Sequence, residues 1–265
     1  NEIKINFALY LRRLVNKSAA PTLAVMLPTS MLWLPSVVAA SASPKHPNIV
    51  YFLTDDQDQM LGGSFPELNG VGPMPQTKAL MAATGSTSSH FHIHTPICNP
   101  SRSSLLSGKY FHNIKTTGGG NKWLMHVDED KVNAATFAKS LKEDAGYTVG
   151  MFGKYMNVMP KTVPAGFDAW MGNGGGNYIA PSFQTSGLEG FTGIKDGMWH
   201  GTSKNYTTAS VGNVSIAWIE SVVKKDPTQP FFAYIAPKAA HEPFNPAPWY
   251  VDHWDRAWPA HEPRP

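Results

Sequence analysis

Residues 98–103, with the sequence C-N-P-S-R-S, hold the one cysteine of the chain among side chains suited to chemistry. A lone cysteine has no intramolecular disulfide partner, so a chemical role gains weight. Asn99 as an N-cap and Pro100 as the first helical residue predict a short helix that opens here. Cys98 would then lie at the positive end of this helix with Arg102 one turn further on. Such a place binds tetrahedral oxyanions such as sulfate or phosphate.

Other polar side chains follow predicted strands. Adjacent carboxylates repel each other unless a cation relieves them, and their hard oxygens suit Ca²⁺ or Mg²⁺. Open α/β sheets build their sites at the carboxyl ends of the strands, so polar groups placed there are expected to meet. The residues concerned are Asp55 and Asp56 after the apolar run 48–54, Lys154 after 148–152, and His241 after 231–236.

The elements that would position these groups alternate along the chain. Strands alternating with helices predict an α/β fold with a largely parallel central sheet flanked by helices. The run 48–54 is apolar enough to be buried on both faces, and the glycine-rich stretch 157–201 is expected to form an irregular surface excursion that borders the site. Further strands are predicted over 87–94, 148–152 and 231–236, and helices over 76–83, 136–144 and 207–225.

Three histidines offer a different chemistry. His90, His92 and His94 occupy alternate positions of the predicted strand 87–94. Alternate positions on a strand share one face, so three imidazoles there could bind zinc in a metallohydrolase that has no need of Cys98. The alternative is an ordinary half-buried strand face, which the pattern favours.

Composition and the N-terminal region limit the class of protein. The chain has 265 residues, 42% of them hydrophobic and 15% charged, with a net charge of +3, so it can bury a large core and has no basic block for nucleic acid.

A basic start and an apolar run to residue 40, then small residues, predict a signal peptide over 1–42. A membrane anchor is the rival, which three prolines in the run disfavour. The sequons at Asn205 and Asn213 suit a secretory route.

The run C-x-P-S-R-S-x-L-L-S-G-K, which ends at Lys109, resembles the signature of the formylglycine-dependent sulfatases. The similarity continues through D-D-Q-D at 55–58, F-G-K-Y at 152–155 and A-P-K-A-A-H at 236–241, and it covers about residues 46–250. Within the family these motifs are most similar to the N-acetylglucosamine-6-sulfatase and arylsulfatase branch. The resemblance implies an alkaline-phosphatase-like α/β domain, with residues 43–265 as the N-terminal portion of the catalytic domain.

The resemblance also implies a set of roles. Cys98 would be oxidised by a formylglycine-generating enzyme to an aldehyde whose hydrate is the nucleophile. Arg102 and Lys154 would offset negative charge, and His241 would contact sulfate or protonate the leaving alcohol. Asp55, Asp56 and the modified Cys98 would hold Ca²⁺, with Mg²⁺ as a second choice. Lys109 would have a structural role near the helix end.

The implied reaction is hydrolysis of a sulfate ester, from a sulfated carbohydrate or an aryl sulfate, in the extracellular space or the lysosome. Family members supply further metal ligands from a later strand that ends in Asp-Asn-Gly, and this chain has no such strand before Pro265. Three hypotheses follow: a sulfatase truncated in this sequence, a short sulfatase-like protein that binds sulfated glycans without catalysis, or a hydrolase of phosphate or phosphonate esters.

Overall fold

The computed structural model describes residues 46–57, 74–88, 90–116 and 125–253. They belong to two compact units, of which the smaller contributes residues 74–87 and the larger all the others. In the smaller unit α2 (Pro75–Thr77) continues into the π-helical turn η2 (Lys78–Ala82), where a helix is predicted. The proposed signal peptide at 1–42 lies outside the described residues. Among the residues described, no helix is both long and apolar enough to cross a membrane.

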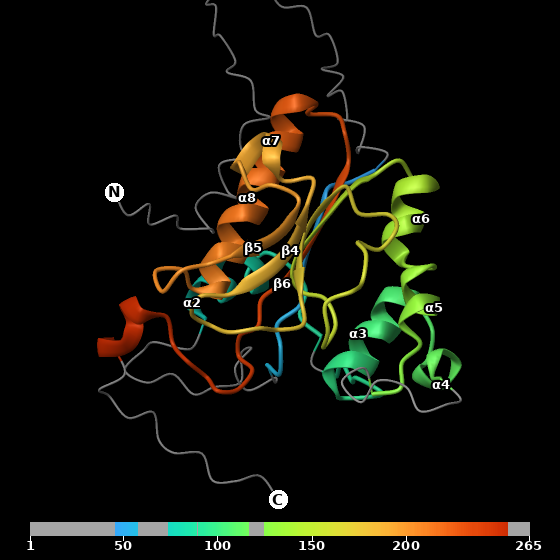
Figure 1. Cartoon of the computed structure of the whole chain (residues 1–265), viewed down its shortest axis with the longest axis horizontal. Coiled ribbons are helices and arrows are strands. Elements are labelled where there is room, and N and C mark those ends of the chain that lie inside the picture. Colours follow the sequence, from blue (N-terminus) through green and yellow to red (C-terminus); the bar gives the residue numbers. More distant parts are fainter. Residues whose placement is uncertain (1–45, 58–73, 89, 117–124, 254–265) are drawn as a thin grey trace, which may run out of the picture. The chain divides into compact units, whose positions relative to one another are not determined.

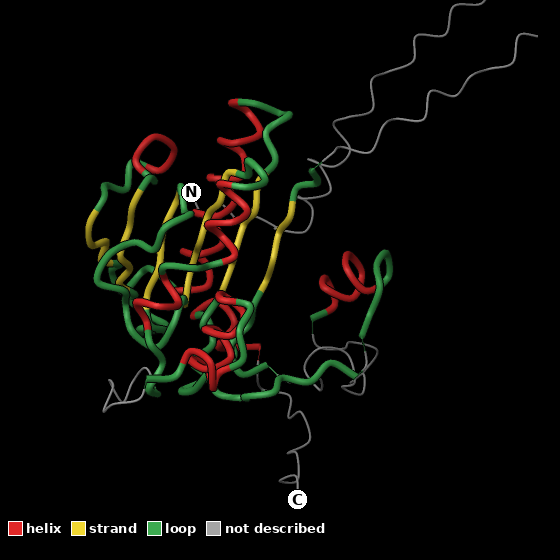
Figure 2. Tube along the Cα trace, turned by 90° about the vertical axis from the view of Figure 1, so that its right-hand side faces the viewer, coloured by secondary structure: helices red, strands yellow, loops and turns green. Residues whose placement is uncertain are grey.

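The larger unit is built on a six-stranded sheet with the strand order β1-β6-β2-β3-β4-β5 (Figures 1 and 2). The first four strands in this order are parallel to one another, whereas β4 and β5 are antiparallel to their neighbours. The strands are β1 (Ile49–Phe52), β2 (Thr148–Lys154), β3 (Ala169–Asn173), β4 (Ser182–Ser186), β5 (Gly197–His200) and β6 (Phe231–Ala236). The predicted α/β class is confirmed, with a parallel half that is extended by an antiparallel ribbon.

Helices flank both faces of this sheet (Figure 1). The helix α8 packs against β2 and β6 on one face, and α6 packs against β2 on the other, where α3 and α5 also lie. The helices of the larger unit are α3 (Cys98–Ser107), α4 (Phe111–Ile114), α5 (Glu129–Asn133), α6 (Phe137–Glu143), α7 (Glu189–Thr192), α8 (Thr207–Lys225) and the 3-10 helix η4 (Pro248–His253).

The core sits on both sides of β2 and β6, the two central parallel strands. Every residue of β6 is buried, and so are the last six residues of β2. On the α8 face Trp218 packs against Phe152 with ring centroids 5.5 Å apart. On the other face Phe137 packs edge-on against Phe232, with ring centroids 5.2 Å apart. These contacts hold α8 and α6 against the central strands, whose carboxyl ends carry the site.

A glycine at the end of β2 allows two strands to approach closely. Gly153 has φ +114°, and a Cβ there would lie 2.0 Å from the carbonyl oxygen of Ala236 on β6. Because no side chain fits in that gap, only glycine permits β2 to pair with β6 as far as Gly153, opposite Ala236. The next residue is Lys154, so the glycine places a lysine at the edge of the sheet.

Several predicted elements agree with the structure, and others do not. The helix 207–225 and the strand 231–236 are found with the predicted bounds. The strand predicted over 87–94 is absent from the described part of that range, where the chain is irregular with bends. The predicted irregular excursion 157–201 instead contains β3, β4, α7 and β5, because aromatic side chains such as Trp170 and Phe183 are fully buried there.

The prediction that the first strand is buried on both faces was also wrong. β1 is the outer strand of the described sheet, and Phe52 is 38% exposed. The doubly covered position belongs to β6, which lies between β1 and β2. Apolar composition alone does not distinguish these two positions, because both strands consist of bulky apolar residues.

Candidate active site

The carboxyl ends of three parallel strands meet at one edge of the sheet. Asp55 and Asp56 follow β1, Lys154 ends β2, and the loop that leads to His241 follows β6. Figure 1 shows α3 at the same edge. Cys98 is the first residue of α3, and its thiol contacts the carboxylates that follow β1. The structure therefore brings together all six of the site residues that the sequence singles out.

Asp55 is the buried centre of this cluster, with 3% exposure. Its Oδ1 lies 3.2 Å from Nη2 of Arg102, and its Oδ2 lies 2.6 Å from Nζ of Lys154. Burial by itself would raise the pKa of Asp55, but Arg102 and Lys154 outweigh it and hold the pKa below its ordinary value. Asp55 is therefore an ionised carboxylate shared between two buried cations.

The backbone of Asp55 is also fixed. Its N–H donates to the carbonyl oxygen of Ala239 at 3.0 Å, and its own carbonyl oxygen accepts from the N–H of Ala240 at 2.7 Å. These two hydrogen bonds join the end of β1 to the loop that carries His241.

The Cys98 thiol lies against both carboxylates. Its Sγ is 3.5 Å from Oδ1 of Asp55 and 3.7 Å from Oδ1 of Asp56. Burial raises the pKa of Cys98, and the two carboxylates raise it further, against the opposing effect of Lys154. The unmodified side chain is therefore held as a neutral thiol, which is a poor nucleophile.

Arg102 reaches the site one turn after Cys98, on the same side of α3. Its Nη1 donates to the backbone carbonyl of Lys154 at 2.7 Å, while Nη2 pairs with Asp55. The guanidinium thus links the ends of β1 and β2.

The predicted helix start was wrong in detail. The N-cap of α3 is Ile97, with no side-chain cap, and Asn99 lies inside the first turn. The Oδ1 of Asn99 instead accepts a hydrogen bond from the N–H of Asn157 at 3.3 Å. Its amide is engaged in a tertiary contact, which sequence preference for a cap does not foresee.

His241 faces Asp56 at the open side of the cluster. Its Nε2 lies 3.6 Å from Oδ2 of Asp56, and the two side chains are 28% and 51% exposed. Its Nδ1 lies 2.7 Å from the carbonyl oxygen of Glu242. A hydrogen bond from Nδ1 to this carbonyl oxygen would hold the ring with Nε2 toward Asp56.

Three side chains of the cluster could supply ligands to a metal ion. One ligand atom each from Asp55, Cys98 and His241 lies within 4.8 Å of the others. As it stands, this set of oxygen, sulfur and nitrogen is typical of zinc, whereas replacement of the sulfur by oxygen leaves two hard oxygens and the nitrogen of His241. Asp55 and Asp56 fit a hard cation, although the described residues supply fewer than the about six to eight oxygens that Ca²⁺ takes.

The histidines of the zinc hypothesis are arranged differently from the prediction. His90, His92 and His94 are exposed and do not lie on a strand. His94 packs edge-on against Tyr110, with ring centroids 5.2 Å apart. Among the described residues the three do not form a metal-binding group, because the group found is Asp55, Cys98 and His241.

Two residues of the site escaped the sequence reasoning. Tyr178, from the β3–β4 connection, is buried, and its hydroxyl donates to the carbonyl oxygen of His241. Lys238 lies over the ring of Tyr178, with Nζ 4.9 Å from the centroid. The A-P-K-A-A-H motif contains Lys238, but a lysine in a predicted loop gives no signal of burial.

Lys109, the last residue of the signature, is exposed just beyond the end of α3.

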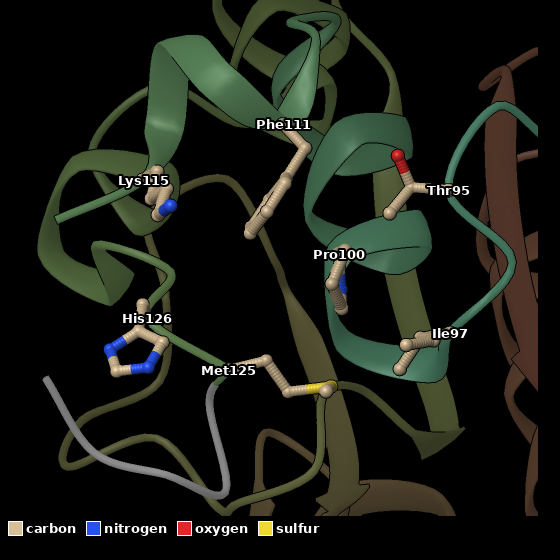
Figure 3. A pocket seen from close by; sticks show the side chains of 7 residues that line it. All are labelled: Thr95, Ile97, Pro100, Phe111, Lys115, Met125 and His126. Atoms are coloured by element: carbon tan, nitrogen blue, oxygen red, sulfur yellow. The ribbon is translucent and has the colours of Figure 1, made fainter.

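A cavity of about 270 Å³ lies beside the first turn of α3 (Figure 3). Cys98 is not among its lining residues, so the cavity is separate from the cluster around the thiol. Its lining residues are Thr95, Ile97, Pro100, Phe111, Lys115, Met125 and His126.

The fold and the cluster define an α/β protein with a cysteine, two carboxylates and several positively charged side chains at the carboxyl ends of its parallel strands. The sequence matches the model of the family described as sulfatase over residues 47–257. The chain belongs to the sulfatase family, as its motifs predicted.

Curated relatives agree with this assignment. The chain is 32% identical over 228 residues to N-acetylglucosamine-6-sulfatase of Homo sapiens. The matched region covers 81% of this chain and 38% of the human protein. It is also 32% identical over 212 residues to the extracellular sulfatase SULF-1 homolog of Drosophila melanogaster, with 79% of this chain and 18% of the fly protein covered. The chain therefore spans well under half the length of these relatives.

Solved structures share the fold. The structure of BT4656 in complex with its substrate D-glucosamine-2-N,6-O-disulfate aligns with a TM-score of 0.56 at 24% identity, over 82% of this chain and 40% of that one. The structure of Ps i-CgsB with k-i-k-neocarrahexaose aligns with a TM-score of 0.57 at 24% identity, over 80% and 49%. The described fold thus corresponds to about half of each of these chains.

Proposed function

We propose that the protein to which this chain belongs is a sulfuric ester hydrolase that acts through a formylglycine made from Cys98. The observation that carries this proposal is the position of the Cys98 Sγ, 3.5 Å and 3.7 Å from carboxylate oxygens of Asp55 and Asp56. Family membership supports the same reading. Residues 43–265 would be the N-terminal portion of the catalytic domain.

The raised pKa of Cys98 fits a side chain that is a precursor of the nucleophile. A formylglycine-generating enzyme, with an external oxidant, would remove two electrons and two protons from the CH₂–SH group, and water would then replace the sulfur, which leaves as hydrogen sulfide. The resulting aldehyde adds a second water to form two geminal hydroxyls. One hydroxyl attacks the sulfur of the ester and the alcohol departs. The other then loses its proton and expels sulfate, which restores the aldehyde. A plain serine or cysteine would remain trapped as a stable ester.

The neighbouring side chains have distinct parts in this scheme. Lys154 and Arg102 carry positive charge where the transferring sulfate gains negative charge. Arg102 acts mainly by holding Asp55 and the end of β2 in place, because its guanidinium donates to the Asp55 carboxylate and to the backbone carbonyl of Lys154. His241, with Nε2 directed at Asp56, is the candidate to protonate the departing alcohol.

Asp55 and Asp56 would hold Ca²⁺, or Mg²⁺, together with an oxygen of the modified Cys98. When bound, such an ion would polarise the sulfate and favour ionisation of the attacking hydroxyl. The neutral Cys98 thiol and the two carboxylates already point toward a common region, so the residues present fit this role.

The substrate that the comparisons favour is a sulfated sugar. Named relatives are N-acetylglucosamine-6-sulfatases, and BT4656 was solved with a glucosamine disulfate. We propose a sugar 6-sulfate as substrate, with aryl sulfates as simpler alternatives. A secretory route to the lysosome or the extracellular space, with a signal peptide at 1–42, fits these relatives. The sequon residue Asn213 is exposed on α8, which is compatible with a glycan.

A peptide map and paired assays test the function. In protein from its natural source, the tryptic peptide 79–102 should contain formylglycine at position 98. That protein should release sulfate from N-acetylglucosamine 6-sulfate, and Cys98→Ala should lower the rate by at least about 1,000-fold. Met198→Ala, a change at an exposed residue of β5, is the control that should keep full activity.

Two outcomes would replace the proposal. An intact thiol with no sulfate release would favour a non-catalytic protein that binds sulfated glycans. Faster release of phosphate from the matched phosphate ester would favour the phosphoryl branch.

A further inference from the structure

Lys238 lies in the loop after β6, three residues before His241, and its side chain turns back into the site. Its Nζ donates to the carbonyl oxygen of Gly176 at 2.6 Å and lies 4.9 Å from the centroid of the Tyr178 ring. A cation over an aromatic face is held in place without being neutralised. The side chain is half-buried, so this ammonium is oriented rather than loose in solvent.

Within the described residues, no carboxylate lies within 4.0 Å of Lys238, whereas Lys154 has its partner in Asp55. An ammonium group has three N–H donors, and the hydrogen bond to Gly176 uses one of them. The lysine thus retains donors and a full charge for a ligand.

Lys238 and Lys154 approach the same pair of glycines. A Cβ on Gly175 would lie 3.5 Å from Cδ and 3.9 Å from Nζ of Lys154, and the next residue, Gly176, holds Lys238. Burial lowers the pKa of Lys238, and Lys154 lowers it further, against the opposing effects of Asp55 and Glu242. The two like charges therefore repel each other, and a bound anion would relieve that repulsion.

Three positively charged side chains gather around the carboxylates of Asp55 and Asp56, while Glu242 acts on Lys238 from the adjoining loop. Arg102 and Lys154 share the single carboxylate of Asp55. Lys238 adds a further positive charge, and Asp56 is half exposed to solvent. An oxyanion that enters beside Cys98 would meet a surplus of donors.

We propose that Lys238 is a further substrate-binding residue, which donates to an oxygen of the sulfate group together with Lys154. The proposal deepens the proposed function and rests on it for the identity of the anion. Tyr178 is the positioning residue: its ring supports the ammonium, and its hydroxyl donates to the carbonyl oxygen of His241. One tyrosine would then set the place of both groups on the loop.

The test compares Lys238→Gln with Lys225→Gln, a change of an exposed lysine at the end of α8. Titration of each protein with sodium sulfate in a calorimeter, against sodium chloride at equal ionic strength, gives the affinity for the inorganic anion. Lys238→Gln should weaken sulfate binding about tenfold, the effect expected when one charged hydrogen bond is lost. Lys225→Gln should leave it unchanged. Equal affinity in wild type and Lys238→Gln, or no sulfate binding by wild type, would overturn the proposal.

A second measurement uses the unmutated chain, so that it does not depend on the folding of a variant. Lysines are labelled with an amine-reactive reagent, and the sites are quantified by mass spectrometry with and without sulfate. Sulfate should slow labelling of Lys238 at least several-fold and leave Lys225 unaffected. Equal protection of both lysines, or of neither, would contradict the proposal.

The turnover assay separates this proposal from the proposed function. If sulfate esters are hydrolysed but Lys238→Gln leaves KM and sulfate affinity unchanged, Lys238 has no binding role and the function stands. If Lys238→Gln weakens sulfate binding in a protein that hydrolyses no ester, the anion site stands and the catalytic proposal fails. In the active enzyme the loss should appear in KM more than in kcat.

Discussion

Asp55 shows how much of the site depends on one buried carboxylate. It pairs with Arg102 and Lys154 at once, and among the described residues these two cations have no second buried acid within ion-pair distance. Removal of one member of a buried ion pair costs more than the pair contributes, because the remaining charge is left without a partner.

We therefore expect Asp55→Asn to lower the free energy of unfolding by about 3–5 kcal/mol. Asp56→Asn is the matched control, because that side chain is half exposed, and it should change stability by no more than about 0.5 kcal/mol. Urea denaturation of the metal-free protein, followed by tryptophan fluorescence, measures both values. Equal effects of the two substitutions would show that burial of Asp55 does not matter.

Tyr155 gives a prediction on alkaline stability. Its buried hydroxyl donates to Oδ1 of Asn133 at 2.8 Å, and burial raises its pKa well above 10. A group whose folded pKa is raised contributes stability that is present below its unfolded pKa, about 10, and is lost as pH rises through the folded value. The free energy of unfolding should therefore fall above about pH 10. Tyr155→Phe should reduce that fall, although it should lower the free energy of unfolding near neutral pH by about 1 kcal/mol through the lost hydrogen bond. Denaturant titrations at several pH values measure this. An unchanged alkaline slope in the variant would contradict it.

At the scale of elements, the register of β2 against β6 determines the position of Lys154. Gly153 is the residue that allows this register, because any Cβ there would overlap the backbone of Ala236. In α8, by contrast, Gly212 leaves room for a side chain, because a Cβ added there would have no atom within 4 Å.

Gly153→Ala should therefore destabilise the protein by about 1–3 kcal/mol or more, since it combines an unfavourable φ with a backbone clash. Gly212→Ala should stabilise it by about 0.5–1 kcal/mol, because alanine is the better helix former. Thermal unfolding of the two variants measures the contrast. A shift of the same sign in both would show that the space around the two positions has been misjudged.

The elements also show where sequence reasoning succeeds. Helical spacing of Val211, Val214 and Trp218 gave α8, and a compact apolar run gave β6, because both patterns are set by local burial. The antiparallel ribbon was missed because its many glycines and polar residues imitate a loop. Asp55, Asp56 and His241 could be predicted because each follows a strand, and Lys154 because it ends one. Cys98 and Arg102, which lie in α3, could be predicted from their motif alone. Lys238 could not, because its burial depends on Tyr178, which is sixty residues away in the sequence.

At the scale of the whole molecule, the proposed metal site predicts a link between Ca²⁺ and folding. An ion that binds only the folded state raises the free energy of unfolding by about 2.7 kcal/mol at a concentration of 100 times its Kd. Calcium should therefore raise the unfolding temperature of the protein, and a chelator should reverse the change. In Asp56→Asn the calcium effect should shrink or vanish. An equal effect of calcium in wild type and variant would place its binding elsewhere.

The sheet order has a consequence for the time course of folding. β6 lies between β1 and β2, although it follows them both in the chain, and the hydrogen bond from Phe231 to Asn48 joins residues 183 positions apart. During synthesis β1 and β2 must wait for β6, because each pairs with it and they do not pair with each other. Pairings this distant form slowly. Until β6 emerges, a nascent chain exposes two apolar strand edges that are open to aggregation.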